Sequence, residues 1–328
     1  MSWFFLFLLL FCAIAFFEIY IPKTHGISPV VFYDVKRGMG DEDVARDLAK
    51  QGIIKSSLFF RIYTVVSGNH AKIQAGRYSV SSSMSIAAIV KKFASGDIVK
   101  EKITIIEGWG SKDIAKYLES KKLYSQKEFL DAASQDWSQG FDFLKDKPAG
   151  LGLEGYLFPD TYHVAIGLTP QDLIKIILNN FDKKLAPELR RETASQKKSI
   201  FQIVTMASIL EKEVKTLDDK KVVAGILWKR IKNGIPLQVD STINYITDKN
   251  DPSASLKDTK INSRYNTYKY AGLPLGPISN PGMDSILAAI YPKESPYLYY
   301  LSADGTGKTI FSKTLEEHNI AKARYLNP

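Results

Sequence analysis

The longest run of hydrophobic positions in this chain lies at its N-terminus. The segment Trp3–Ile21 contains a single charged residue, Glu18, near its end. As an α-helix it would be roughly 28 Å long at about 1.5 Å per residue, close to the hydrocarbon thickness of a bilayer. Trp3 and Tyr20 stand where interfacial aromatic residues are common. We therefore predict a transmembrane anchor over residues 1–22.

A cleaved signal peptide is the alternative for this segment. Ala13-Ile14-Ala15 has the small side chains of a cleavage site, but no basic residue precedes the apolar run and the bulky Phe16 follows. Basic residues begin at Lys23, which favours a cytoplasmic body, although large domains cross membranes largely regardless of this bias. The function of the body must therefore decide its orientation.

Two stretches of the chain share one pattern at an offset of 70 residues. "GMGDEDVARDLAKQGIIKSSLFF" from Gly38 aligns without gaps on "GWGSKDIAKYLESKKLYSQKEFL" from Gly108. Each copy follows a short alternating strand and predicts a glycine turn and two helices. Neither is a dinucleotide loop, because Asp43 and Asp113 replace the third glycine. We expect two related α+β modules.

The first module, residues 29–99, closes with a strand at 75–80 and an amphipathic helix that ends at Gly96. A strand, two helices and a strand resemble the LysM-like glycan-binding module in outline. The second copy lies in residues 100–149 and leads into the remaining domain. The fold class is therefore predicted as α+β, with a membrane helix followed by small modules.

Residues 150–328 have a different texture, rich in Gly, Pro and aromatic residues at the start and in turn-forming residues from Asp248 to Gly282. Asp304-Gly305 between alternating segments predicts a hairpin, and a capping box at Thr314–Glu317 begins the last helix. Three further helices are predicted, near 170–185, at 199–216 and up to Gly234.

The charge and the cysteine count narrow the function classes. The chain has 44 Lys and Arg against 35 Asp and Glu, a net charge of +9, which favours anionic partners in general. Its basic residues form no block that interleaves with aromatics, so we predict no nucleic-acid partner. The single cysteine, Cys12, excludes a disulfide within the chain, and the four scattered histidines have no ligand spacing, so we predict no metal and no cofactor.

The stretch "MASILEKEV", Met206–Val214, places two carboxylates at the end of an apolar helix. Glu211 and Glu213 lie about 160° apart around the helix axis and cannot both face one substrate. Glu213 lies on the more apolar shoulder, and an apolar wall raises the pKa of a carboxyl, as a general acid near neutral pH requires. Two solvated glutamates at a helix end are the plain alternative.

The segments Leu237–Ile246 and Ser263–Gly282 combine aromatic faces with amides and hydroxyls, which suit a sugar. Gln238 and Asp240, two positions apart in a segment predicted to be extended, would point the same way. An ordinary connecting loop is the alternative for the Pro- and Gly-rich part. The candidate binding residues in these segments are Gln238, Asp240, Thr242, Tyr245, Tyr265, Asn266 and Tyr268.

The order of "EGYLFPDTY", "ASILEKE", "LQVDSTINY", "YNTY" and "GLPLGPISNPG" resembles the endolytic murein transglycosylase (YceG-like) family over roughly residues 150–320. The resemblance implies a lysozyme-like mixed α/β catalytic domain, with Glu213 as the catalytic residue and with motifs at Leu237-Gln238 and Tyr265-Asn266. Val214 departs from the usual Ser or Thr, which puts the hydrogen bonding of the acid in doubt. Lys308 departs from a common His at the rim.

The resemblance implies cleavage of the β-1,4 bond between N-acetylmuramic acid and N-acetylglucosamine within glycan strands, giving 1,6-anhydro ends. Glu213 would act first as acid and then as base. Murein lies outside the cytoplasmic membrane, so the implied body is extracytoplasmic on a single-pass anchor. The implied partners are peptidoglycan strands and the lipid bilayer, and peptidoglycan synthases are left open.

Two alternatives to this function stay open. The chain could be a non-catalytic glycan-binding scaffold of the cell wall machinery, or a hydrolase, which would need a second carboxylate such as Asp240 or Glu154. Glu154 and Tyr156, in the "EGYLFPDTY" motif, either line the cleft or hold the loop beneath it.

Overall fold

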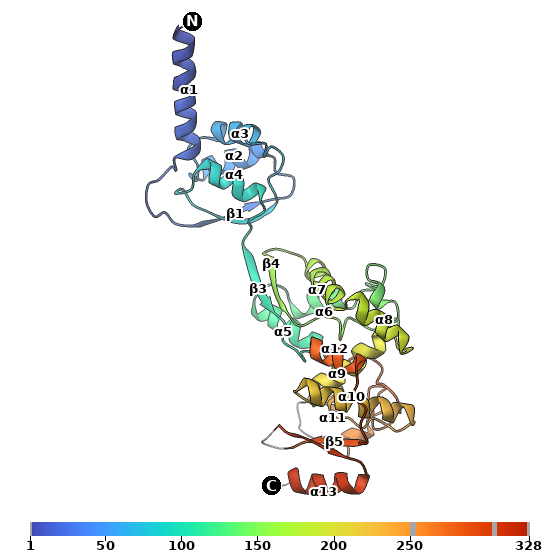
Figure 1. Ribbon diagram of the computed structural model, residues 1–328. Coiled ribbons are helices and arrows are strands. Elements are labelled where there is room, and N and C mark those ends of the chain that lie inside the picture. Colours follow the sequence, from blue (N-terminus) through green and yellow to red (C-terminus); the bar gives the residue numbers. More distant parts are fainter. Residues whose placement is uncertain (1, 250–253, 304–306, 327–328) are drawn as a thin grey trace. The chain divides into compact units, whose positions relative to one another are not determined.

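The computed structural model describes residues 2–249, 254–303 and 307–326. Helices dominate it, and the strands of the described residues form three two-stranded sheets (Figure 1). The predicted α+β class is confirmed at this level. The chain divides into two compact units. One runs from the N-terminal helix to Ile103 and includes His163–Leu168, and the other holds Thr104–Tyr162 and the chain from Thr169 onward.

The first unit begins with the predicted apolar helix. Trp3–Tyr20 is the one helix of the described residues that is long and apolar enough to cross a membrane. The two strands predicted for this unit are present as β1 and β2, which pair antiparallel from Val31↔Val80 to Val35↔Gly76. The elements of this unit are α1 (Ser2–Tyr20), β1 (Val31–Val35), α2 (Asp41–Lys50), α3 (Ser57–Val66), β2 (Gly76–Val80) and α4 (Ile86–Ala94).

Strand β3 (Lys100–Thr104) pairs with β4 (Thr161–Ala165). The helices of the second unit are α5 (Ser111–Ser120), α6 (Gln126–Ala133), α7 (Pro170–Lys184), α8 (Pro187–Ser195), α9 (Ile200–Glu213), α10 (Leu217–Lys232), α11 (Asp240–Thr247), α12 (Met283–Ile290) and α13 (Leu315–Tyr325). The predicted hairpin is present as β5 (Tyr299–Ser302) and β6 (Thr309–Ser312), which pair antiparallel. Its turn, Asp304-Gly305, lies outside the described residues.

The two copies of the repeat fold alike. Gly40 and Gly110 precede α2 and α5 with the same backbone angles, φ −84° and ψ 169°. The carboxylates of Asp43 and Asp113 accept hydrogen bonds from these glycine N–H groups at 3.2 and 3.0 Å, which satisfies an unpaired donor at each helix start. Equivalent positions are buried in both helices: Val44, Ala45 and Leu48 in α2, and Ile114, Ala115 and Leu118 in α5.

Two sequence-based expectations are wrong in detail. The helix predicted at 199–216 ends at Glu213, because Val214 is extended and Thr216 already caps α10. The segment holding Gln238 is not extended, because Gln238 has a left-handed φ of 53°. The domain boundaries at 29–99, 100–149 and 150–328, and the likeness of these parts to LysM and lysozyme, stay predictions.

Candidate active site

Glu213 is the last residue of α9, a helix that Ser199 caps at its start. Its Oε2 accepts a hydrogen bond from the hydroxyl of Tyr300 at 3.0 Å, and its backbone oxygen accepts one from Ser302 Oγ at 3.1 Å. Tyr300 and Ser302 are two positions apart in β5 and so point to the same side of the strand. The C-terminal hairpin therefore closes over the end of α9.

The carboxyl of Glu213 lies among groups that pull its pKa in both directions. Burial raises the pKa of Glu213, the polar groups of Ser241 and Tyr300 lower it, and the nearby charge of Asp240 raises it. The upward direction is the one expected from the sequence. The surroundings are more polar than the expected apolar wall, because hydroxyl groups from α11 and β5 face the carboxyl.

Asp240 approaches this group from the start of α11, and Gln238 lies two positions before it. The hydroxyl of Tyr268 donates a 2.6 Å hydrogen bond to Asp240 Oδ1. Gln238 Oε1 accepts from Arg230 Nη2 at 3.0 Å, and the guanidinium of Arg230 lies 5.5 Å from the ring centroid of Tyr299. The carboxyl of Glu213 is thus surrounded by side chains from α11, the loop at Tyr268 and the hairpin, and Arg230 of α10 lies behind Tyr268 and Tyr300.

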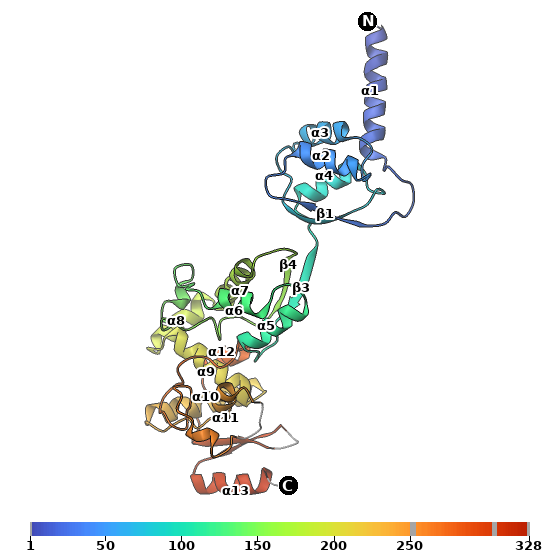
Figure 2. The same cartoon turned by 180° about the vertical axis from the view of Figure 1, so that it is seen from behind.

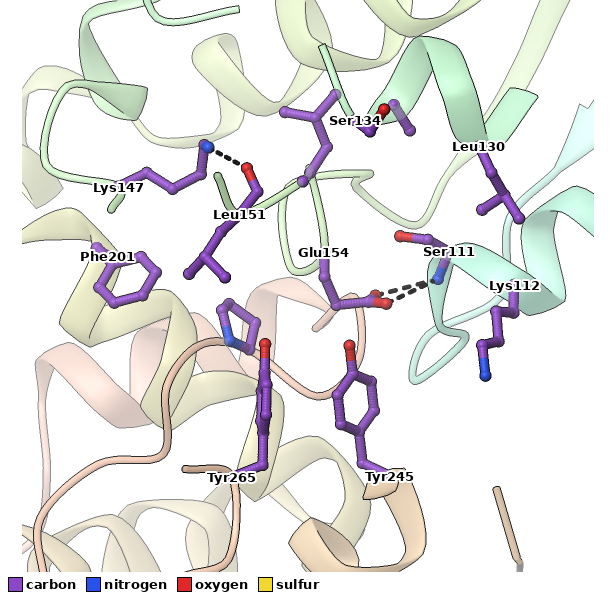
Figure 3. Close-up of a pocket in the computed structure, with 14 residues that line it drawn as sticks. Ser111, Lys112, Leu130, Ser134, Lys147, Leu151, Glu154, Phe201, Tyr245 and Tyr265 are labelled. Carbon is purple, nitrogen blue, oxygen red and sulfur yellow. Dashed lines mark hydrogen bonds between the residues drawn. The ribbon is translucent and has the colours of Figure 1, made fainter. Parts of the chain in front are cut away.

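A second group of predicted residues lines a cavity of about 280 Å³. Figure 3 shows Tyr245 and Tyr265 side by side, with their hydroxyl groups on the side that faces Glu154. Their ring centroids are 4.9 Å apart. The cavity is close to the lower end of the size range of small-molecule sites, about 300 Å³. Its walls include Leu151, Glu154, Phe201, Tyr245, Tyr265 and Pro277.

Glu154 is fixed by donors from two distant segments. Ser111 N, at the start of α5, lies 3.1 Å from both carboxylate oxygens, and Asn280 Nδ2 donates at 3.1 Å. Burial raises the pKa of Glu154 to about 7, against the lowering effect of the Ser111 and Gly155 hydrogen bonds. This carboxyl can therefore gain or lose a proton near neutral pH.

Three of the predicted binding residues are fully buried, and their contacts are internal. Asn266 donates from Nδ2 to the backbone oxygens of Thr259 and Ile261. Thr242 donates to the oxygen of Val239. The ring of Tyr156 packs in an aromatic cluster with Phe143 and Phe181. These residues hold the walls of the site, and their direct contact with a sugar stays a prediction.

Glu211 has a set of partners separate from that of Glu213. Its Oε1 pairs with Lys220 Nζ at 3.1 Å, and its Oε2 accepts from Gly282 N at 2.9 Å and from Ser285 Oγ at 2.7 Å. Its side chain is 9% exposed. The two glutamates of the "EKE" motif therefore differ in role: Glu211 anchors the helix, and Glu213 faces the candidate site.

Sequence reasoning missed Tyr300, Ser241 and Arg230. Tyr300 lies in a hairpin that the sequence predicts, and the alternation of β5 puts Tyr300 and Ser302 on one face. Nothing in that alternation says which element the face would meet. Within the described residues, no three His, Cys, Asp or Glu side chains come together in a way that could hold a metal ion.

Comparison with known proteins supplies the family. The model of the YceG-like family matches residues 33–324. The endolytic murein transglycosylase of Bacillus subtilis (strain 168) is 33% identical, over 93% of this chain and 88% of its own length. The endolytic murein transglycosylase of Streptococcus pneumoniae serotype 2 is 29% identical. The match covers 94% of this chain and 60% of the length of that protein. A crystal structure of a yceG-like protein from Listeria monocytogenes superposes with a TM-score of 0.62 at 32% identity, covering 90% of this chain and 100% of its own.

Proposed function

The chain belongs to the YceG-like family, and from this premise we propose that it is a membrane-anchored endolytic murein transglycosylase that leaves 1,6-anhydro ends. Relatives named endolytic murein transglycosylase match over nearly the whole chain. The observation that carries the proposal is the half-buried carboxyl of Glu213, whose pKa burial raises and which accepts a hydrogen bond from Tyr300.

The reaction uses one carboxyl twice. Protonated Glu213 donates its proton to the glycosidic oxygen, so that the bond to the anomeric carbon of N-acetylmuramic acid breaks and the N-acetylglucosamine hydroxyl leaves. The resulting carboxylate takes the proton of the muramic acid 6-hydroxyl, whose oxygen bonds to the same anomeric carbon. Glu213 ends protonated as it began, and no water is consumed. Tyr300 stabilises the carboxylate between the two steps.

The glycan strand lies across both groups of side chains. Helix α11 contributes Asp240 to the group around Glu213 and Tyr245 to the cavity, about 7.5 Å apart along the helix axis. The loop that holds Tyr265 and Tyr268 spans the same two groups. In this proposal Gln238, Asp240 and Tyr268 lie near the bond that breaks, and Glu154, Tyr245 and Tyr265 bind a neighbouring sugar.

The location follows from the substrate. Murein is outside the cytoplasmic membrane, so in this proposal α1 crosses that membrane once, and the rest of the first unit and the whole second unit are extracytoplasmic. The partners are murein strands and the bilayer, and work beside peptidoglycan synthases belongs to the same proposal.

The test is mass spectrometry of murein digested by the purified full-length protein. We expect anhydro-ended products, and Glu213→Gln should lower their rate of formation by about 10²–10⁴-fold, the usual contribution of a general acid. Glu294→Gln, at an exposed glutamate outside both groups, is the matched control. Products with reducing ends would indicate a hydrolase, for which the nearness of Asp240 to Glu213 provides a second carboxylate. Strands bound but left intact would indicate a scaffold.

A further inference from the structure

Helix α3 exposes large apolar side chains on its outer face. Leu58, Val65 and Val66 are 57%, 61% and 79% exposed. They lie on one side of the helix, seven and eight positions apart. Arg61 is the only charged residue among the ten of α3. A soluble surface helix normally turns charged residues outward, so this face is unusual for one that meets water.

The same helix lies against α1. The rings of Phe59 and Phe11 are 6.3 Å apart between centroids, and those of Tyr63 and Tyr20 are 5.9 Å apart, edge to face. Figures 1 and 2 both show α3 beside the C-terminal half of α1. The side of α3 that carries Phe59 and Tyr63 is therefore in contact with the apolar helix.

The position of this contact along the axis of α1 determines how deep α3 lies when α1 crosses a bilayer. Phe11 is nine positions before Tyr20, about 13 Å from the end of the helix along its axis. Since Phe59 lies within 6.3 Å of Phe11, its ring is several ångströms inside the apolar length of α1. Amphipathic interfacial helices lie about 5–10 Å into the boundary between headgroups and acyl chains.

We propose that α3 is an interfacial helix that inserts its Leu58, Val65 and Val66 face into the outer leaflet of the bilayer that α1 spans. The proposal goes beyond the murein chemistry and rests on the proposed anchoring by α1. It makes the first unit a membrane-surface module, held by two apolar helices instead of one.

The charged residues around α3 suit the same position. Lys55, just before the helix, places its Nζ 4.4 Å from the ring centroid of Phe17 in α1. Arg61 is exposed on α3, and its Nη2 lies 3.6 Å from Oε2 of the exposed Glu42. Long basic side chains at this level can extend to the headgroups while their stems stay in the apolar region, and anionic lipids favour them.

Lipid is a better occupant of this face than a second copy of the chain. Only 6% of the apolar span of α1 is buried, so most of the helix needs a lipid environment. The exposed face of α3 adjoins that span at the depth of Phe11, and whatever covers α1 there also reaches α3.

The test places a polarity-sensitive nitrobenzoxadiazole probe on the full chain in phosphatidylglycerol-containing vesicles. Cys12, the only cysteine, is first replaced (Cys12→Ala), and the probe is attached through Val66→Cys or Leu58→Cys. Phe32→Cys is the matched control, because Phe32 is 62% exposed and lies in β1, on the side of the first unit away from α1. We expect blue-shifted emission and quenching by acyl-chain spin labels at positions 66 and 58, and aqueous emission at position 32.

Three outcomes would overturn the proposal. Aqueous, unquenched emission at positions 66 and 58 would place α3 in water. A blue shift that disappears when the protein is diluted at constant lipid would indicate an interface between copies. Release of the labelled chain by alkaline carbonate would remove the anchor on which the proposal rests. Murein cleavage by the same proteins is measured in parallel, so that loss of activity with buried probes contradicts the proposed function alone.

Discussion

Two neighbours act on the pKa of the Glu213 carboxyl in opposite directions. We therefore expect their replacement to shift the pH profile of the reaction in opposite directions. The Tyr300 hydrogen bond lowers the pKa of Glu213, and the charge of Asp240 raises it. In Tyr300→Phe the acid should stay protonated to higher pH, so the alkaline limb of the kcat/KM profile moves up, by about one pH unit. In Asp240→Asn the limb should move down. The measurement is the pH dependence of murein cleavage.

Ser302→Ala is the control for this pair, because Ser302 donates to the backbone oxygen of Glu213 and not to its carboxyl. The alkaline limb of the kcat/KM profile of Ser302→Ala should therefore stay at the wild-type pH. A shift of Tyr300→Phe and Asp240→Asn in the same direction would mean that another group controls the limb.

The residue types of the site are visible in the sequence, but their exposure is not. Glu213 stands out because it is a carboxylate on the more apolar shoulder at the end of an apolar helix, although the sequence alone also allows a solvated glutamate there. Asn266 and Thr242 have the same chemistry as exposed sugar ligands, yet both are fully buried and bonded to backbone. Whether an amide faces a ligand or holds a loop depends on partners that the local sequence does not specify.

At the scale of the elements, Glu211 fixes the last turn of α9. Its pair with Lys220 is almost fully buried, with side chains 9% and 4% exposed. Glu211→Gln would remove the hydrogen-bonded counter-charge of the buried Lys220 ammonium and leave Glu107 as a neighbouring carboxylate, so the free energy of unfolding should fall, by up to about 3–5 kcal/mol. Because Glu213 follows two residues later, kcat should fall more than KM changes. Urea unfolding and cleavage kinetics measure the two effects.

A double-mutant cycle provides the control for this ion pair. Glu211→Gln combined with Lys220→Met removes both charges and should be more stable than Glu211→Gln alone. A cost below about 1 kcal/mol for the single change would instead be typical of an exposed pair.

The sequence predicts elements whose structure depends on local signals, but it does not predict segments whose conformation depends on distant hydrogen-bond partners. The repeat needs only a glycine turn, an aspartate three positions on and helical periodicity, so the local sequence predicts both copies. The prediction of an extended segment before α11 is wrong because Val239 N and Gln238 N donate hydrogen bonds to Thr267. These bonds hold Gln238 in its left-handed conformation. That partner lies 28 positions beyond Val239, outside any local pattern.

At the scale of the whole molecule, Asn280 joins segments that are far apart in the sequence. Its Oδ1 accepts from Gly155 N and Leu157 N, both at 2.9 Å, and its Nδ2 donates to the backbone oxygen of Trp109 and to Glu154. Gly155 has a φ of 90°, and a Cβ there would lie 2.6 Å from Pro277. The wall of the cavity therefore depends on three chain segments meeting closely, and Glu154 is enclosed where they meet.

This enclosure makes the stability of the fold depend on pH through Glu154. The pKa of Glu154 is about 7 in the folded chain against 4.5 for the free side chain. Between these values the folded state keeps the proton that the unfolded state has lost, so the free energy of unfolding falls as pH rises from about 4.5 to 7, by about 3 kcal/mol. The glutamine in Glu154→Gln cannot titrate. The difference in free energy of unfolding between wild type and variant should therefore change by this amount from about pH 4.5 to 7 and be constant above about pH 7. Urea unfolding at several pH values, followed by tryptophan fluorescence, measures it, and a difference independent of pH would mean that Glu154 is ionised in the fold at neutral pH.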